Sequence, residues 1–217
     1  MPELKIAALI PTDGIYARAG EFVPLTRIGR VSVIRQCVQT ALVEGISAVY
    51  LVSGKEPEKI RNAVRKIEKL YPDVTFVYLQ DPWYVINGML GLVQCGLEAV
   101  SEQNEFDAVI VTPGDTITIE SRIYQCLVKR AQTSEYPAIC TYFKAEFGYP
   151  VLIKSRCFKQ IMNFDGVGFR RSLTDIEIEL VRASDCGVLL NSERDDVYSK
   201  MLADIDAIGY SGAASAV

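Results

Sequence analysis

A single acidic residue, Asp115, follows an apolar segment at a position where chemistry on phosphates needs a carboxylate. The run 108–111 (AVIV) is typical of a short buried strand, and it leads into Gly114-Asp115. In open α/β sheets ligands bind at the carboxyl ends of strands, and Mg²⁺ is often held by one or two carboxylates together with substrate phosphates. A Gly-Asp pair is equally typical of a plain turn. Both interpretations, a metal ligand and a turn, stay open from this segment alone.

The chain contains no histidine. This absence excludes Ser-His-Asp and Cys-His triads, imidazole bases and histidine metal sites. Any catalysis must therefore use carboxylates, lysine, arginine, tyrosine, backbone amides or a bound metal. Such groups favour phosphoryl or nucleotidyl transfer, in which the enzyme mainly positions the reactants and neutralises charge.

A glycine-containing loop, residues 11–25, follows the first predicted strand. Gly14 and Gly20 supply backbone freedom and Arg18 supplies positive charge, as in loops that bind phosphate groups. The sequences GxxxxGK[ST] and GxGxxG are both absent, and the Asp13 carboxylate would repel phosphate oxygens unless a cation intervenes. The loop is either a phosphate-binding loop or an ordinary surface loop.

Aromatic and basic residues mark two later segments. Trp83 and Tyr84 could stack on a base or sugar, but aromatic residues more often attach a loop to the core, and core packing is favoured here. Arg170 and Arg171 could meet an anionic substrate or form a solvated basic pair. The glycines at 148, 166 and 168 mark turns, which a ligand could approach closely.

An acidic stretch, residues 189–198, lies near the end of the chain. It contains Asn191, Glu193, Asp195 and Asp196. A second carboxylate near Asp115 would complete a metal site for phosphate chemistry. The stretch also fits the capped, acidic first turn of a helix, and this interpretation is favoured.

Composition limits the class of protein. The 217 residues suit a single domain, predicted over 1–210 with a loosely ordered tail at 211–217. The net charge of −4 and the pI near 5.1 argue against nucleic-acid binding. No apolar run approaches the about 20 residues of a membrane span, and the start lacks signal-peptide features. Six scattered cysteines without a CxxC pair predict reduced thiols in a cytoplasmic protein.

Apolar runs alternate with segments of helical period over the first two thirds of the chain, which predicts a parallel-rich sheet with helices on both faces. After residue 137 shorter strands predict an antiparallel extension of this sheet. The predicted strands are 5–10, 48–52, 74–79, 108–111, 138–142, 150–153, 177–182 and 188–190. The predicted helices are 31–44, 58–70, 88–100, 121–133 and 158–164, with another after residue 194.

The order of these segments resembles the MobA-like nucleotidyltransferases, the family of molybdenum-cofactor guanylyl- and cytidylyltransferases, from about residue 6 to 202. The positions that match family motifs are Gly14, Arg18, Gly20, Pro24 and Leu25; Tyr84, Gly88, Met89, Gly96 and Leu97; Gly114 and Asp115; Gly148, Tyr149, Pro150 and Leu152; Gly166 and Gly168; and residues 187–198. No single match is specific, but their common order is hard to obtain by chance. The resemblance implies an α/β protein with the three-layer α/β/α nucleotide-diphospho-sugar transferase-like fold and a mixed, mostly parallel sheet.

The resemblance also implies a reaction and its residues. A phosphorylated small molecule would attack the α-phosphorus of an NTP, CTP or GTP, with Mg²⁺ as cofactor and pyrophosphate as product. Gly14, Arg18, Gly20 and Gly88 would contact the nucleotide. Arg18 and Asp115 would be catalytic, and Asp115 and Glu193 would bind the metal.

Several family positions carry other residues here. They are Asp13 in the glycine-rich entrance, Ala19 for methionine, Val23 for the lysine that neutralises phosphate charge, Leu90 and Leu92 for small polar residues, Tyr149 for histidine, and Asn191 and Glu193 for two aspartates. Arg27 or Lys55 could replace the missing cation. Loss of one charge-stabilising group typically costs about 10²–10³ in rate. Three functions therefore stay open: a nucleotidyltransferase with weak or lost activity (a pseudoenzyme), a non-catalytic nucleotide-binding or regulatory module, and a sugar-phosphate nucleotidyltransferase.

Overall fold

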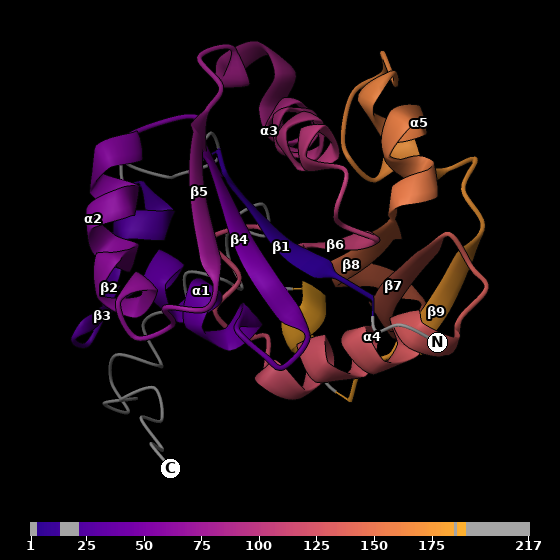
Figure 1. Cartoon of the computed structure of the whole chain (residues 1–217), viewed down its shortest axis with the longest axis horizontal. Helices are drawn as coiled ribbons and strands as arrows, with labels where there is room; N and C mark the ends of the chain where they lie inside the picture. Colours follow the sequence, from indigo (N-terminus) through magenta and orange to yellow (C-terminus); the bar gives the residue numbers. More distant parts are fainter. Residues whose placement is uncertain (1–3, 14–21, 185, 190–217) are drawn as a thin grey trace.

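The computed structural model describes residues 4–13, 22–184 and 186–189 of the chain. Its centre is a seven-stranded sheet in the order β5-β4-β1-β6-β8-β7-β9 (Figure 1). The strands are β1 Ile6–Thr12, β4 Ile46–Ser53, β5 Thr75–Gln80, β6 Ala108–Val111, β7 Ala138–Phe143, β8 Glu146–Lys154 and β9 Ile178–Arg182. In this sheet β8 runs antiparallel to both of its neighbours, and the remaining pairings are parallel. The predicted mixed, mostly parallel sheet is confirmed.

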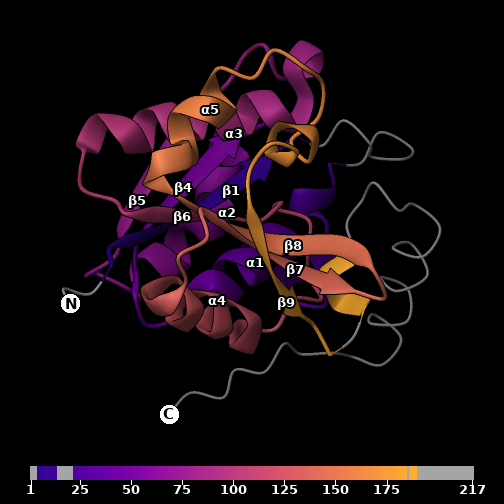
Figure 2. The same cartoon turned by 90° about the vertical axis from the view of Figure 1, so that its right-hand side faces the viewer.

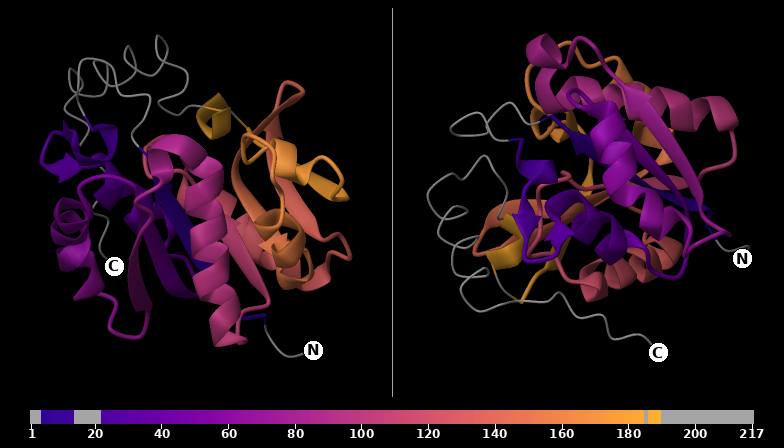
Figure 3. Two further views of the ribbon diagram at one scale, coloured as in Figure 1. Left: turned by 90° about the horizontal axis from the view of Figure 1, so that it is seen from above. Right: turned by 90° about the vertical axis from the view of Figure 1, so that its left-hand side faces the viewer.

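Helices cover both faces of the sheet. Helices α1 (Val33–Ala41), α2 (Pro57–Glu68) and α4 (Ser121–Thr133) lie on one face, and α3 (Tyr84–Gln103) and α5 (Phe158–Met162) lie on the other (Figure 2). Seen from above, α3 crosses the middle of the sheet beside α5 (Figure 3, left). The side-chain amide of Gln94 joins these two helices, because it donates hydrogen bonds to the carbonyls of Ile161 (3.0 Å) and Phe164 (2.9 Å). The three-layer arrangement is confirmed.

The two central strands are the most apolar because they are covered on both faces. All seven residues of β1 and all four of β6 are buried. This explains why they are continuous apolar runs rather than alternating ones. Helix α3 approaches β1 closely at Gly96, where a Cβ atom would lie 2.2 Å from Cδ1 of Leu9. The central strands thus form a rigid base for the loops at their ends.

Two predicted elements differ from the structure. The predicted strand 188–190 is wrong as far as the described residues reach: Cys186–Leu189 form a 3-10 helix, η5, whose Val188 carbonyl would lie 2.4 Å from a Cβ atom on Gly148. The predicted helix 31–44 begins later, because Val31–Ser32 (β3) pairs with Arg27–Ile28 (β2) in a hairpin. It also ends earlier, at Ala41, before Gly45 turns the chain with a φ of 92°. A contact with the distant Gly148 decides the first case, whereas a local hairpin and the turn at Gly45 decide the second.

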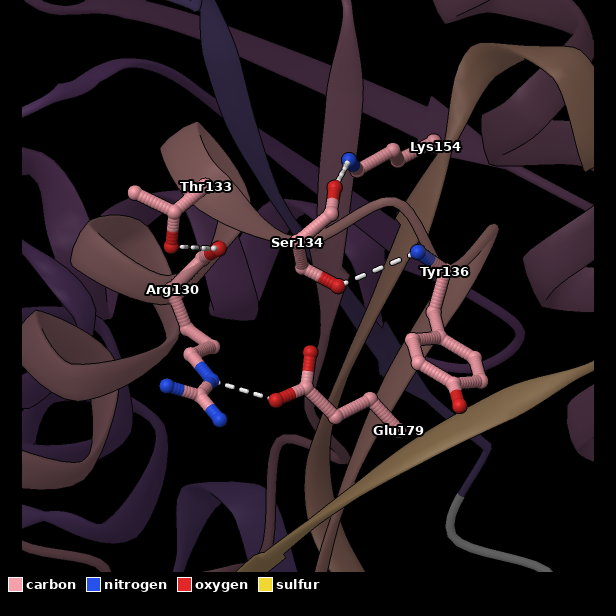
Figure 4. A network of polar contacts seen from close by, with 6 residues as sticks. All are labelled: Arg130, Thr133, Ser134, Tyr136, Lys154 and Glu179. Carbon is pink, nitrogen blue, oxygen red and sulfur yellow. Dashed lines mark hydrogen bonds and ion pairs between the residues drawn. The ribbon is translucent and has the colours of Figure 1, made fainter.

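The edge strand β9 is joined to its surroundings by a network of polar contacts (Figure 4). Arg130 at the end of α4 forms an ion pair with Glu179 of β9. Lys154 at the end of β8 donates to the carbonyl of Ser134, whose hydroxyl oxygen accepts the Tyr136 N–H at 3.1 Å. The network connects α4, β8 and β9 through charged groups.

None of the described helices has the length and apolar character that crossing a membrane requires. All six cysteines lie in the described part of the chain, and none forms a disulfide.

Candidate functional site

Asp115 lies beside the carboxyl end of β1. Strand β6 ends at Val111, but the chain stays alongside β1: Thr112 donates its N–H to the Leu9 carbonyl (3.0 Å) and Gly114 donates to the Pro11 carbonyl (2.8 Å). The carboxylate of Asp115 comes directly afterwards, and the residue is 7% exposed. The structure therefore supports the predicted position of Asp115 at a strand end.

Neighbouring side chains hold this segment in place. The Thr116 hydroxyl donates to the Pro113 carbonyl (2.7 Å), and the buried Tyr124 hydroxyl donates to Oγ1 of Thr112 (3.0 Å). Burial, and secondly the charge of Asp115, raises the pKa of the Cys37 thiol on α1. The carboxylate thus lies close to α1 in surroundings largely shielded from water. Attraction between this carboxylate and a cation is stronger there than in bulk solvent.

The glycine-containing loop begins next to Asp115. A Cβ atom on Gly114 would lie 2.5 Å from Cγ2 of Thr12, the last residue of β1. The far end of the loop leads into η2 (Val23–Leu25), whose Pro24 is buried. The predicted site residues Gly14, Arg18 and Gly20 lie outside the described residues, as does Glu193. The structure therefore brings the start of the loop to Asp115 and does not test the loop's own residues.

Gly88 interrupts helix α3. Its backbone angles, φ 57° and ψ −151°, are not helical, and a Cβ atom there would meet nothing within 4 Å. Such a conformation is strongly disfavoured for residues other than glycine. Gly88 therefore changes the direction of the chain at an open position, between the first turn of α3 and its long buried part.

The two aromatic residues before Gly88 behave differently. Trp83 is 65% exposed, so the predicted core packing is wrong for this residue. The backbone N–H of Trp83 donates a hydrogen bond to the Asp81 carboxylate (2.8 Å), as in a turn. Tyr84 is packed, because a Cβ atom on Gly54 at the end of β4 would lie 2.2 Å from its Cγ atom.

Three motifs that are far apart in the sequence meet around Tyr149. The residue is buried, and its hydroxyl lies 3.5 Å from the sulfur of Met89. Its ring stacks on Phe169, with centroids 6.4 Å apart, and the Arg170 guanidinium lies 5.3 Å from its centroid. Sequence reasoning identified these segments but missed the contacts among them, since no local pattern signals contacts between distant segments. It also left Arg170 and Arg171 equivalent, although only Arg170 has this ring contact among the described residues.

The described residues contain no group of three or more acidic or cysteine side chains arranged to hold a metal ion. Asp115 nevertheless fits Mg²⁺, which takes one or two carboxylates and completes its shell with water and substrate phosphates. Of the two candidate replacement cations, Lys55 is exposed just after β4, on the edge of the sheet where β1 also ends, and Arg27 is exposed in the β2–β3 hairpin.

Comparison with known proteins agrees with this arrangement. Residues 17–182 match the family model described as the MobA-like NTP transferase domain, which is more than half of the chain. No curated protein matches the sequence.

Solved structures share the fold at low sequence identity. Rv0371c from Mycobacterium tuberculosis H37Rv has a TM-score of 0.72 and 14% identity, covering 93% of this chain and 99% of that one. A manganese complex of the same protein has a TM-score of 0.63 and 13% identity, with coverages of 84% and 90%. The 4-diphosphocytidyl-2C-methyl-D-erythritol synthase of Anaerococcus prevotii has a TM-score of 0.69 and 14% identity, with coverages of 95% and 96%. A CMP:2-keto-3-deoxy-manno-octonic acid synthetase complexed with CTP has a TM-score of 0.65 and 13% identity, with coverages of 92% and 99%.

Proposed function

Because the chain belongs to the MobA-like NTP transferase domain family, we propose that it transfers a nucleoside monophosphate from an NTP to a phosphorylated small molecule. An oxygen of the acceptor phosphate attacks the α-phosphorus and forms a new phosphorus–oxygen bond. The bond between the α-phosphorus and the oxygen of the leaving pyrophosphate breaks, and pyrophosphate is released. The observation that carries the proposal is the nearly buried Asp115 carboxylate, whose neighbour Gly114 packs against Thr12 at the end of β1.

Each site residue has a role in this proposal. Gly14, Arg18 and Gly20 hold the triphosphate, and Gly88 gives the nucleotide room beside α3. Asp115, with Glu193, holds a divalent cation, Mg²⁺, which neutralises phosphate charge when it is bound. Support for a divalent metal comes from the manganese complex of Rv0371c, and support for CTP from the complex of the synthetase.

The proposed unit is residues 1–210, acting in the cytoplasm. Six free cysteines support this location, because such thiols persist in a reducing compartment. Partners other than the NTP and the acceptor, such as nucleic acid or membrane, are not part of the proposal.

Calorimetric titration of the four NTPs, with and without Mg²⁺, tests the proposal together with a pyrophosphate-release assay. We expect Asp115→Asn to remove the metal-dependent part of NTP affinity and to lower any pyrophosphate release by about 10²–10³. Asp107→Asn is the matched control, because Asp107 is exposed at the opposite end of β6, where it accepts the Lys5 N–H at 2.8 Å. If Asp115→Asn leaves the metal-dependent NTP affinity unchanged, Asp115 is not a metal ligand.

A non-catalytic nucleotide-binding or regulatory module is the second candidate. Val23, where related proteins have a lysine, and Asp13 at the start of the loop favour it, since both reduce the positive charge that a triphosphate needs. This candidate predicts NTP binding without pyrophosphate release for every phosphorylated acceptor, sugar phosphates included. Val23→Lys should raise NTP affinity if only this charge has been lost. An unchanged affinity would contradict the assignment of the loop to the phosphates.

A further inference from the structure

A cavity of about 320 Å³ lies between the β7–β8 hairpin and the segment around η4 (Arg171–Leu173). Its apolar wall is formed by Cys140, Phe147, Val151, Leu173 and Ile176. Arg170 and Thr174, which also line it, are exposed and supply its side-chain charge and hydroxyl. The volume is at the lower end of the range of ligand sites, and a mostly apolar wall with few polar groups is typical of them.

Arg170 supplies a positive charge that is available to a ligand. Its guanidinium forms no hydrogen bond or ion pair with the described part of the chain and lies over the Tyr149 ring, while its backbone carbonyl accepts the Leu173 N–H. Its charge also opposes the rise in the pKa of the Cys140 thiol, so the guanidinium lies close to the cavity wall. By contrast, Arg122 and Arg130 on α4 are paired with carboxylates.

The cavity lies toward the same edge of the sheet as the proposed reaction site. Strand β8 is antiparallel to β6, with Val151 opposite Val111, the last residue of β6. Phe147 and Gly148 therefore lie beyond the end of β6, on the side to which the chain continues toward Asp115. The hairpin and η4 both lie on the side of the molecule toward which the parallel strands run (Figure 2). Tyr149 also connects Arg170 with Met89, the neighbour of Gly88.

We propose that this cavity holds the apolar part of the acceptor, and that Arg170 binds the phosphate group of the same molecule. The acceptor is then an amphipathic phosphorylated compound, carrying a short alkyl chain or one aromatic ring, rather than a sugar phosphate. Sugar hydroxyls facing Phe147, Leu173 and Ile176 would lose their hydrogen bonds to water without replacement. The inference rests on the proposed function, since it makes the occupant the acceptor of that reaction.

Calorimetric titration of the full chain with small probes tests this inference. The probes are hexyl phosphate, hexan-1-ol, inorganic phosphate and glucose 6-phosphate, with heptanoate to separate a phosphate from a carboxylate head group. We expect hexyl phosphate to bind at least about tenfold more tightly than hexan-1-ol, inorganic phosphate or glucose 6-phosphate, since it gains both the apolar and the charged contact. Heptanoate binding as tightly as hexyl phosphate would overturn the assignment of a phosphorylated occupant.

Three variants locate the binding. Arg170→Gln should weaken the binding of hexyl phosphate about tenfold or more and leave the binding of hexan-1-ol unchanged. Arg171→Gln, at the next residue, is the matched control and should change the affinity for neither probe. Thr174→Trp adds a large ring at the exposed margin of the cavity and should abolish binding of both probes. Binding of CTP with Mg²⁺ is measured in every variant, and we expect it to be unchanged, which also shows that the variant is folded.

The outcomes separate the two proposals. This inference alone is overturned if the protein binds CTP but does not prefer hexyl phosphate among the probes. It is also overturned if that preference is unchanged in both Arg170→Gln and Thr174→Trp. Absence of NTP binding by the unaltered protein overturns the proposed function, and with it the assignment of the cavity's occupant as an acceptor.

Discussion

Gly114 and Thr12 are in contact where β6 and β1 end. A Cβ atom on Gly114 would lie 2.5 Å from Cγ2 of Thr12 and 2.9 Å from Cδ1 of Ile34. The Gly114 N–H also donates a 2.8 Å hydrogen bond to the Pro11 carbonyl. The glycine is therefore required by close packing, and this packing fixes Asp115 relative to the end of β1.

This contact predicts that Gly114→Ala destabilises the protein by about 1–3 kcal/mol, the usual cost of overpacking a core. Adding Thr12→Ser removes the Cγ2 atom, so the double variant should recover part of the loss, while Ile34 still limits the recovery. Urea unfolding of both single variants and the double variant measures the coupling. If the losses in the free energy of unfolding of the two single variants simply add in the double variant, the contact with Thr12 is not the reason that glycine is needed at 114.

Gly88 offers a second test, because its backbone is strained while its surroundings are open. Gly88→Ala should lower the free energy of unfolding by about 1–3 kcal/mol through its φ of 57° alone. Gly29 is a matched control, since it also has a positive φ, 58°, and open space for a Cβ atom, but lies in the β2–β3 turn. If Gly88 contacts the nucleotide, only Gly88→Ala should also weaken NTP binding in calorimetry. An equal effect of the two variants on affinity would contradict that role.

The cavity predicts a particular response to alkaline pH. Burial raises the pKa of the Cys140 thiol from its usual 9.0 to about 11, against the opposing charge of Arg170. The folded protein then keeps the proton that the unfolded chain loses near pH 9, so the free energy of unfolding falls as the pH rises from 9 to 11. The contribution of Cys140 is at most about 3 kcal/mol.

Urea unfolding between pH 8 and pH 11 measures this contribution. Cys140→Ala should have a flatter dependence on pH than the unaltered protein, whatever its stability at pH 8. Cys126→Ala, at an exposed cysteine of α4, should leave the slope unchanged. If the free energy of unfolding depends on pH in the same way in all three proteins, Cys140 does not contribute to that dependence.

Much of this fold follows from local sequence patterns. The observed bounds of β6 and α4 are those predicted, because a short apolar run and a clear helical period each define an element without help from distant residues. The position of Asp115 at a strand end follows in the same way. The matching order of motifs then predicted the family.

Features that depend on distant contacts were not predictable. Residues 186–189 form a 3-10 helix against Gly148 of β8 rather than a strand. The cavity needs residues from β7, β8 and the segment after Gly168 at once, and neither Arg170 nor Arg171 is distinguished until the ring of Tyr149 is placed.

The ion pair that joins the edge strand β9 to α4 involves Glu179, so it depends on the ionisation of this carboxylate (Figure 4). A hydrogen bond from the Ser134 side chain, followed by the hydrogen bond and charge of Arg130 and the charge of Lys154, lowers the pKa of Glu179 below its usual 4.5, although partial burial opposes this. A lowered pKa in the folded state stabilises the protein above the pKa of the unfolded chain. This stabilisation is lost as the pH falls through the lower, folded value.

Glu179→Gln should therefore lower the free energy of unfolding at pH 7 by about 1 kcal/mol or less, because Arg130 is largely exposed and water screens the pair. The difference from the unaltered protein should shrink as the pH is lowered below 4.5 and through the folded pKa of Glu179, where the unaltered side chain takes up its proton. Urea unfolding at each pH measures it. Glu120→Gln is the control, since Glu120 and its partner Arg122 are both 57% exposed, and it should change stability little at any pH. A Glu179→Gln curve that stays parallel to that of the unaltered protein would mean that the carboxylate does not stabilise β9 through its charge.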